Sequence, residues 1–142
     1  MGRLTTFVDS TGDADRFVWD ALMPWMDAAM IDLKALDPAV HRYLTGRPNE
    51  RVLASIGYLA GTGRLYEVRL LLVPGVNDGE RMLARTADWL CTIDPTMRIK
   101  LIGFRRHGTR PVAVQLPEMT PSRLAEVRDL LDGRGLHNVV TV

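Results

Sequence analysis

The chain alternates between short aliphatic runs and segments of helical periodicity, and this alternation limits its fold more than any other feature. Five runs are rich in β-branched and aliphatic residues, as strands are; they cover residues 4–8, 28–31, 68–73, 99–102 and 137–142. Between the runs, apolar residues recur every three or four positions, as Val52, Ile56 and Leu59 do, which is typical of a helix with one buried face. Strict alternation of strands and helices predicts an α/β fold in which right-handed crossovers join parallel strands.

The charge balance argues against two classes of partner. The chain has 142 residues, with 18 Lys and Arg against 17 Asp and Glu, for a formal net charge of +1. A field this weak does not attract nucleic acid or anionic lipid over a distance. None of the apolar runs reaches the roughly 18–20 residues that a membrane-spanning helix needs. We therefore expect a single globular domain with neither nucleic acid nor a membrane as its partner.

The cysteine content limits both the redox chemistry and the location of the protein. Cys91 is the one cysteine of the chain, so it cannot form an internal disulfide and cannot by itself supply a zinc or iron–sulfur site. It lies within a helical pattern, where a small apolar role is expected. A chain without disulfides suits a reducing compartment, and we expect a cytoplasmic protein.

Polar side chains gather where the predicted strands end. The first strand ends at Asp9 and Ser10, and the second continues through Asp32 to Lys34, while Arg69 lies on the third. Ligands bind at the carboxyl ends of strands in parallel sheets, so these residues are expected to face one site.

Two readings of the aspartates remain open from spacing alone. Asp9 and Asp32 could hold a hard cation such as Mg²⁺, Na⁺ or K⁺, whose preferred ligands are oxygens. They could equally cap the helices that follow them. Lys34, two residues after Asp32, either donates to a ligand from the same face or is a solvated surface lysine.

Six segments resemble, in the same order, the motifs of one enzyme family. They are residues 6–12, 30–34, 41–46, 49–53, 68–78 and 102–108. The first ends in Asp-Ser-Thr-Gly, the second contains Asp-x-Lys, and the third has the pattern His-x-x-Leu-x-Gly. With these motifs the chain is similar to the radical S-adenosylmethionine enzymes that activate glycyl radical enzymes, the pyruvate formate-lyase activase family.

The resemblance implies a particular architecture. Members of the family fold as a partial (β/α) barrel of parallel strands, of which this chain would supply about four barrel strands and a trailing strand. The family also carries a Cys-x-x-x-Cys-x-x-Cys motif that binds a [4Fe–4S] cluster and a Gly-Gly-Glu strand, and neither motif occurs in this sequence. We therefore expect residues 1–142 to form a single partial radical SAM barrel, the C-terminal half, without the cluster-binding N-terminal half.

The resemblance also implies a ligand, S-adenosylmethionine, lying across the barrel mouth. By position, Asp9 and Asp32, together with the backbones of Ser10 and Leu33, match a monovalent-cation site beside the nucleoside.

Other positions match the surroundings of the ligand itself. Lys34 and Arg69 match positions near its methionyl or ribose end, and Val73 packs beside it. Where the family has Leu-Pro-Tyr-His, with the histidine at the ligand, this chain has Ile-Gly-Phe-Arg. His107 or Arg105 would then take the place of that histidine.

The function implied is that of one half of an activating enzyme. The chain would bind S-adenosylmethionine and contribute to radical generation only with a cluster-bearing half, acting on a glycyl radical enzyme. The edge of the first strand would be covered by that half or by a second copy of the chain, since an open apolar edge promotes association. Two alternatives are a non-catalytic remnant that binds a partner or a nucleoside, and a stand-alone doubly wound domain that binds Mg²⁺.

Overall fold

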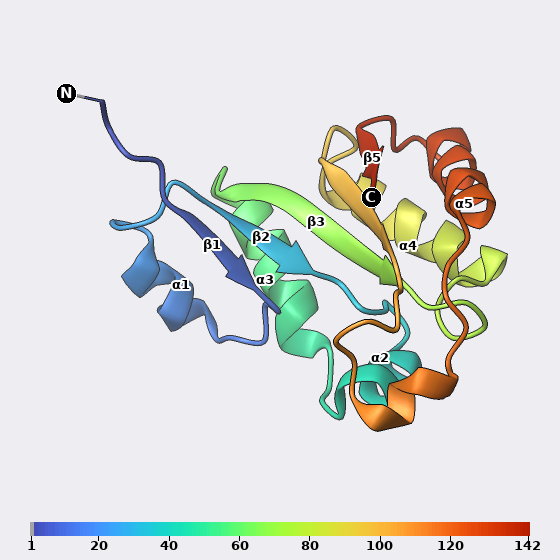
Figure 1. Cartoon of the computed structure of the whole chain (residues 1–142). Coiled ribbons are helices and arrows are strands. Elements are labelled where there is room, and N and C mark those ends of the chain that lie inside the picture. Colours follow the sequence, from blue (N-terminus) through green and yellow to red (C-terminus); the bar gives the residue numbers. More distant parts are fainter. Residues whose placement is uncertain (1) are drawn as a thin grey trace.

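The computed structural model of the chain describes residues 2–142 and shows a single parallel sheet with helices packed against it (Figure 1). The strands are β1 (Phe7–Ser10), β2 (Ala28–Asp32), β3 (Leu65–Leu72), β4 (Ile99–Gly103) and β5 (Val139–Thr141). The helices are α1 (Arg16–Leu22), α2 (Pro38–Thr45), α3 (Glu50–Gly61), α4 (Glu80–Ile93) and α5 (Pro121–Gly133), with a 3₁₀ turn η1 (Pro111–Gln115). None of the helices in this described part is long and apolar enough to cross a bilayer.

The strands follow one another across the sheet in chain order. The order is β1-β2-β3-β4-β5, and every neighbouring pair is parallel. Each crossover therefore steps in the same direction, as in a (β/α) barrel. A doubly wound sheet reverses its order part-way, so the alternative of a stand-alone doubly wound domain is wrong. The prediction of an α/β fold with parallel strands is confirmed.

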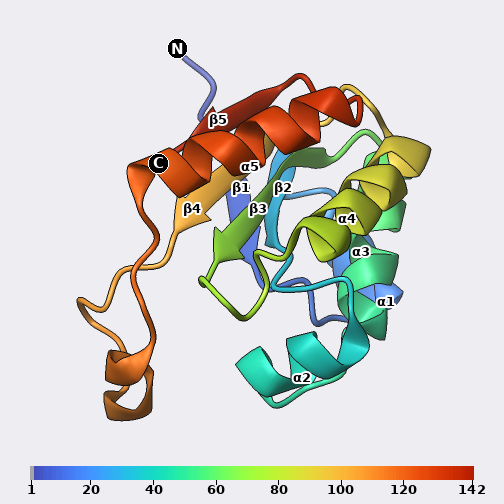
Figure 2. The ribbon, with the colours of Figure 1, turned by 90° about the vertical axis from the view of Figure 1, so that its right-hand side faces the viewer.

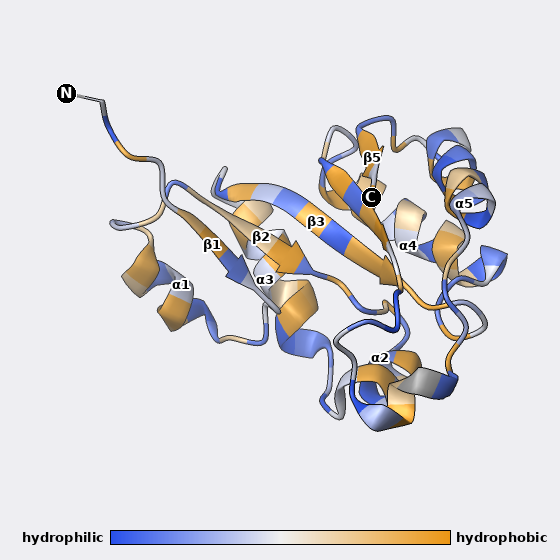
Figure 3. Cartoon of the chain, viewed as in Figure 1, coloured by the Kyte–Doolittle hydropathy of each residue, from blue (hydrophilic) through white to orange (hydrophobic). Residues whose placement is uncertain are grey.

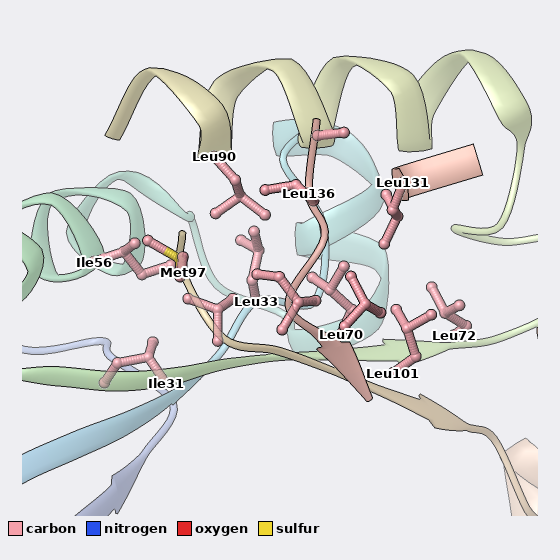
Figure 4. Close-up of a cluster of buried hydrophobic side chains, with 14 of the residues drawn as sticks. Ile31, Leu33, Ile56, Leu70, Leu72, Leu90, Met97, Leu101, Leu131 and Leu136 are labelled. Atoms are coloured by element: carbon pink, nitrogen blue, oxygen red, sulfur yellow. The ribbon is translucent and has the colours of Figure 1, made fainter. Parts of the chain in front are cut away.

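The two faces of the sheet differ in chemistry. The helices cover one face of the sheet (Figure 2). On that face Ile31, Leu70 and Leu101 are almost completely buried in the core (Figure 4). On the other face, Asp32, Arg69 and Lys100 stand side by side on β2, β3 and β4 and are only partly buried. The hydropathy colouring shows hydrophilic bands within the otherwise apolar β3 (Figure 3). One face is thus a core, and the opposite face, called the open face below, is polar.

A β-bulge interrupts the pairing of β2 with β3. Ala29 pairs with Leu65, but the next residue, Met30, pairs with Glu67, so that Tyr66 has no counterpart on β2. The bulge lies in the first three residues of β3, which begins at Leu65, whereas the sequence pattern predicted a strand that begins at Val68. The ring of Tyr66 stacks on Phe7 of β1 with centroids 4.9 Å apart.

The turn after β1 depends on a glycine. Gly12 has a φ of 77°, and a Cβ atom placed there would lie 2.8 Å from Cγ2 of Ile31. We predict that Gly12→Ala lowers the free energy of unfolding by about 1–3 kcal/mol, because it combines a left-handed backbone with a steric clash. Urea denaturation measures this change.

Gly57 provides the matched control. It lies within α3, and a Cβ atom there meets nothing within 4 Å. Gly57→Ala is expected to raise stability by about 0.5–1 kcal/mol through the helix preference of alanine. Equal stability of the two variants would contradict the role given to Gly12.

Candidate functional site

The carboxyl end of β2 carries a carboxylate and an ammonium in contact. Nζ of Lys34 donates to Oδ2 of Asp32 at 3.2 Å, and each side chain is about one quarter exposed, 25% and 27%. The ammonium has more N–H donors than this one contact uses. The N-cap of the next helix is Asp37, so Asp32 does not cap it. Lys34 is therefore partly buried and paired, not a freely solvated lysine.

Arg69 connects three strands on the open face. Its Nη1 donates to Oδ2 of Asp9 on β1 at 2.8 Å, and its Nε donates to Oε1 of Glu67 at 3.0 Å. Its Nη2 lies 2.9 Å from Sδ of Met30 on β2. The N-cap of α1 is Asp15, so the capping interpretation is wrong for Asp9 as well. Asp9 and Arg69 are brought together as a pair.

Glu67 fixes the guanidinium of Arg69 from the same face of β3. Glu67 is only 2% exposed, and its second oxygen, Oε2, accepts from Nε of Arg98 at 2.8 Å. Burial alone would raise its pKa, but the hydrogen bonds from Arg98 and Arg69 outweigh burial and lower the pKa below the ordinary value. Glu67 is not among the site residues predicted from the sequence. Its spacing of two residues from Arg69, which places both side chains on one face of a strand, was the available signal.

The geometry gives no support to the expected cation site. Asp9 pairs with Arg69 and Asp32 pairs with Lys34, so each carboxylate already has a positive neighbour. Among the residues that the structure describes, no three His, Cys, Asp or Glu side chains gather as metal ligands. A monovalent cation at Asp9 and Asp32 remains a prediction.

The side chain of Asn77 holds the end of β3 by hydrogen bonds. Val73 is buried, and its backbone N–H donates to Oδ1 of Asn77 at 2.7 Å. Nδ2 of the same Asn77 donates to the carbonyl of Lys34 at 2.8 Å. Val73 and Lys34, both predicted to lie beside a ligand, are thus joined through one residue. The Pro-Gly turn signal predicted the turn but did not reveal the contacts of Asn77.

The side chains of two predicted residues are directed away from this group, although the predicted role of Ser10 was that of its backbone. Ser10 follows Asp9, so its side chain points to the opposite face of β1, and its Oγ accepts from the N–H of Gly12 at 2.9 Å. His107 is exposed on the arm between β4 and α5, which extends away from the sheet (Figure 2). Nη1 of Arg105, at the base of the same arm, donates to the carbonyl of Met119 at 3.2 Å. The structure does not bring His107 to the other predicted residues.

A buried histidine borders the same end of β2. A cavity of about 170 Å³ is lined by Asp32, Lys34 and His41, among others. His41 is 3% exposed, and its Nδ1 has no hydrogen-bond partner within the described residues. Burial lowers its pKa, although Asp13 acts in the opposite direction. The imidazole is therefore a neutral wall of this cavity.

Cys91 does not fit an iron–sulfur cluster. It is partly buried in α4, and its Sγ lies 3.5 Å from the carbonyl of Arg134. Because a cluster of this kind needs several thiolates, the residues of this chain cannot hold one.

The comparisons with known proteins converge on one family. No family model matches the chain. It is 26% identical over 121 residues to the pyruvate formate-lyase-activating enzyme of Streptococcus mutans, covering 80% of this chain and 46% of that protein. It is 31% identical over 113 residues to the isethionate sulfite-lyase activating enzyme of Nitratidesulfovibrio vulgaris, covering 76% of this chain and 35% of that protein. The chain is related to the pyruvate formate-lyase activating enzymes.

Solved structures show the same fold. A domain of a pyruvate-formate lyase-activating enzyme from Bacteroides vulgatus matches 98% of this chain and 81% of its own, with a TM-score of 0.82 and 24% identity. A radical SAM methyltransferase from Sphaerobacter thermophilus matches 96% of this chain and 39% of its own, with a TM-score of 0.76 and 18% identity. The predicted partial barrel of the radical SAM type is confirmed. This relative of the activating enzymes spans less than half the length of the curated proteins that it matches.

The buried ion pairs of Glu67 generate a prediction about stability and pH. Glu67→Gln is expected to lower the free energy of unfolding at pH 7 by about 2 kcal/mol, because two guanidinium groups lose their shared carboxylate. The lowered pKa means that this contribution is complete above 4.5, the ordinary value, and is lost as the pH falls through the folded-state pKa. Urea denaturation at several pH values measures the difference between variant and wild type.

Glu126→Gln is the control for this measurement. Glu126 pairs with Arg123, but its side chain is 64% exposed, so its removal should change stability by no more than about 0.5 kcal/mol. A deficit of Glu67→Gln that stays constant from neutral to acidic pH would contradict the assignment.

Proposed function

We propose that the chain is the S-adenosylmethionine-binding C-terminal half of an activating enzyme for a glycyl radical enzyme. The observation that carries this proposal is the meeting of Lys34, Asp32 and Arg69 at the open face of the sheet, in a chain related to such enzymes. Carboxylate, ammonium and guanidinium groups at the carboxyl ends of parallel strands suit a ligand that carries charged groups and hydroxyls.

Each residue of this group has a distinct role in the proposal. Lys34 and Arg69 donate hydrogen bonds to the methionyl or ribose end of the ligand, and Val73 forms an apolar wall beside it. Asp32 accepts from a hydroxyl of the ligand and keeps the Lys34 ammonium in place through their contact. These residues bind and orient; none of them transfers an electron. Asp9 and Asp32, with the Ser10 and Leu33 backbones, are the proposed ligands of a monovalent cation. Arg105, or His107 after a movement of the arm that carries it, is the proposed replacement for the family's histidine at the ligand.

The electron must come from outside this chain. A [4Fe–4S] cluster held by another segment would supply the one-electron reduction chemistry, and the residues of this chain would only bind and orient S-adenosylmethionine. The single cysteine supports a requirement for a cluster-bearing N-terminal half. In the proposal residues 1–142 are one partial barrel, inactive without that half.

The edge of β1 is where a further half would join. β1 pairs with β2 and forms one edge of the sheet, and Phe17 and Trp25, on and just after the adjoining α1, are 69% and 78% exposed. Such an edge with nearby apolar side chains favours association. The proposed occupant is the cluster-bearing half, and a second copy of this chain is the other possibility.

A second candidate function rests on the same cysteine count. A chain that cannot hold the cluster could serve as a non-catalytic remnant that binds a nucleoside or a partner protein. Deoxyadenosine formation under reducing conditions, after co-expression with a cluster-bearing N-terminal segment, separates the two functions. Its formation supports the activase role, and its absence with intact ligand binding supports the remnant.

Calorimetric titration tests the ligand directly. We predict saturable binding of S-adenosylmethionine in K⁺ buffer. Lys34→Gln and Arg69→Gln are each expected to weaken binding about tenfold or more, since a hydrogen bond to a charged group contributes roughly 1.5–3 kcal/mol. Arg134→Gln, which removes an exposed arginine paired with Asp88, should leave the affinity unchanged. Absence of binding, or equal affinities of all three variants, contradicts the proposed ligand.

The same titration separates the cations. Binding that requires K⁺ supports the monovalent-cation site, whereas equal affinity with and without K⁺ contradicts it.

Light scattering tests the edge. At micromolar concentration the chain alone is expected to self-associate through β1 and to associate as a heterodimer when a cluster-bearing half is present. A monomer with fully cooperative thermal unfolding would contradict the proposal that another chain packs on the edge of β1.

A further inference from the structure

The strands β2 and β3 part at the candidate site. Their ladder ends at the pair of Asp32 and Arg69, where the N–H of Leu33 donates to the carbonyl of Arg69 at 2.9 Å. Beyond this point the chain leaves β2 for α2, whereas β3 continues to Leu72. The carbonyl of Leu71 therefore faces the gap without the N–H group that a longer β2 would give it, and the carbonyl of Lys34 borders the same gap. Buried carbonyls without partners are costly.

Asn77 fills this gap with its side-chain amide. It is 4% exposed, and its Nδ2 donates to the carbonyls of Lys34 and Leu71, both at 2.8 Å. Its Oδ1 accepts from the N–H of Val73 at 2.7 Å. Two acceptors face the NH₂ group and one donor faces the oxygen, so this network fixes the orientation of the amide. The Asn77 side chain thus supplies hydrogen bonds between the ends of β2 and β3 where backbone pairing has stopped.

The turn that carries Asn77 is itself held in place. Gly75 has a φ of 78°, and its N–H donates to Oδ1 of Asp78 at 2.8 Å. Nε of Arg123 on α5 lies 3.2 Å from Oδ2 of Asp78, and its Nη2 donates to the carbonyl of Asp78 at 2.7 Å. The side chain of Asn77 is thus delivered from a turn that α5 anchors.

We propose that Asn77 is a positioning residue of the S-adenosylmethionine site, fixing the end of β2 against the end of β3. The inference rests on the proposed function, because its consequence is the placement of Lys34 and Val73 beside that ligand. The ammonium of Lys34 reaches Asp32, the register partner of Arg69, only while the backbone of Lys34 stays close to β3. The contact of Asn77 with the Lys34 carbonyl keeps it there.

The choice of variant follows from the space around Asn77. It borders a void of about 10 Å³ that Lys34 and Thr86 also line. Truncation to alanine would enlarge this void and admit a water that replaces part of the amide. Asn77→Asp is sharper, because it keeps the shape and the acceptor for Val73 but turns carboxylate lone pairs toward two carbonyls. Asn77→Leu removes all three hydrogen bonds.

Affinity and stability measured together test the positioning role. Asn77→Asp is expected to weaken binding of S-adenosylmethionine about tenfold or more and also to lower the melting temperature. The control is Val127→Ala, which removes a fully buried side chain of α5; it should lower the melting temperature as well but leave the affinity unchanged. If both variants weaken binding equally, or neither does, the positioning role is overturned.

A measurement without ligand separates this inference from the proposed function. In ¹⁵N NMR spectra of the free chain, Asn77→Asp should shift the amides of Ala35 and Leu72, which follow the two carbonyls that Asn77 contacts. Asn77→Leu should also accelerate hydrogen exchange of the Val73 amide, whereas Val127→Ala should do neither. If the wild type fails to bind S-adenosylmethionine while these changes occur, only the proposed function is wrong. If the amides are unchanged, the inference is wrong whatever the ligand.

Discussion

Every connection in this fold steps across the sheet in the same direction, and the rest of the structure depends on that constraint. Right-handed crossovers that never reverse place their helices on a single face. One face of the five-stranded sheet is therefore buried beneath the helices, and no helix within residues 2–142 packs on the other face. In a closed barrel the second face would be sheltered by the strands opposite. In this structure that face carries the partly buried charged side chains of Asp32, Arg69 and Lys100.

Arg69 is the centre of that polar face. It reaches past β2 to Asp9 on β1 and contacts Glu67 on its own strand, while Asp32 on β2 and Lys100 on β4 stand beside it in register. A buried ion pair of this kind contributes little net stability, because desolvation offsets attraction. Its greater effect is geometric, since a guanidinium held by two carboxylates has few alternative orientations. The contacts that pair the charged groups of the open face therefore also preorganise a binding surface.

The sequence reveals the architecture more fully than the site. The alternation of short aliphatic runs with helical periodicity predicts all five strands, because burial of one strand face and one helix face leaves a direct trace in residue order. It also places Asp32 and Lys34 together at a strand end. The motif order adds the family and the partial barrel, which alternation alone does not distinguish from other parallel folds.

What escapes the sequence are contacts between residues far apart in the chain. The pairing of Asp9 with Arg69 joins residues 60 positions apart, and no local pattern specifies it. Asn77 reaches the carbonyl of Lys34 across 43 positions, in a turn whose residues predict only a turn. Glu67 reads as an ordinary charged residue until its two arginines are seen. The exposed position of His107 likewise depends on the path of a long arm that periodicity cannot describe.

The bulge at Tyr66 determines which side chains of β3 lie on each face of the sheet. Leu65 and Glu67 are two residues apart and would share a face in a regular strand, yet Leu65 packs against the core whereas Glu67 lies on the open face beside Met30. The extra residue changes the phase of the alternation, so that an apolar strand beginning can be followed by a polar strand end without a break in pairing. β3 therefore pairs with β2 in one register before the bulge and in another after it. Deletion of one residue at this point would move side chains of the open face to the core face and core side chains to the open face.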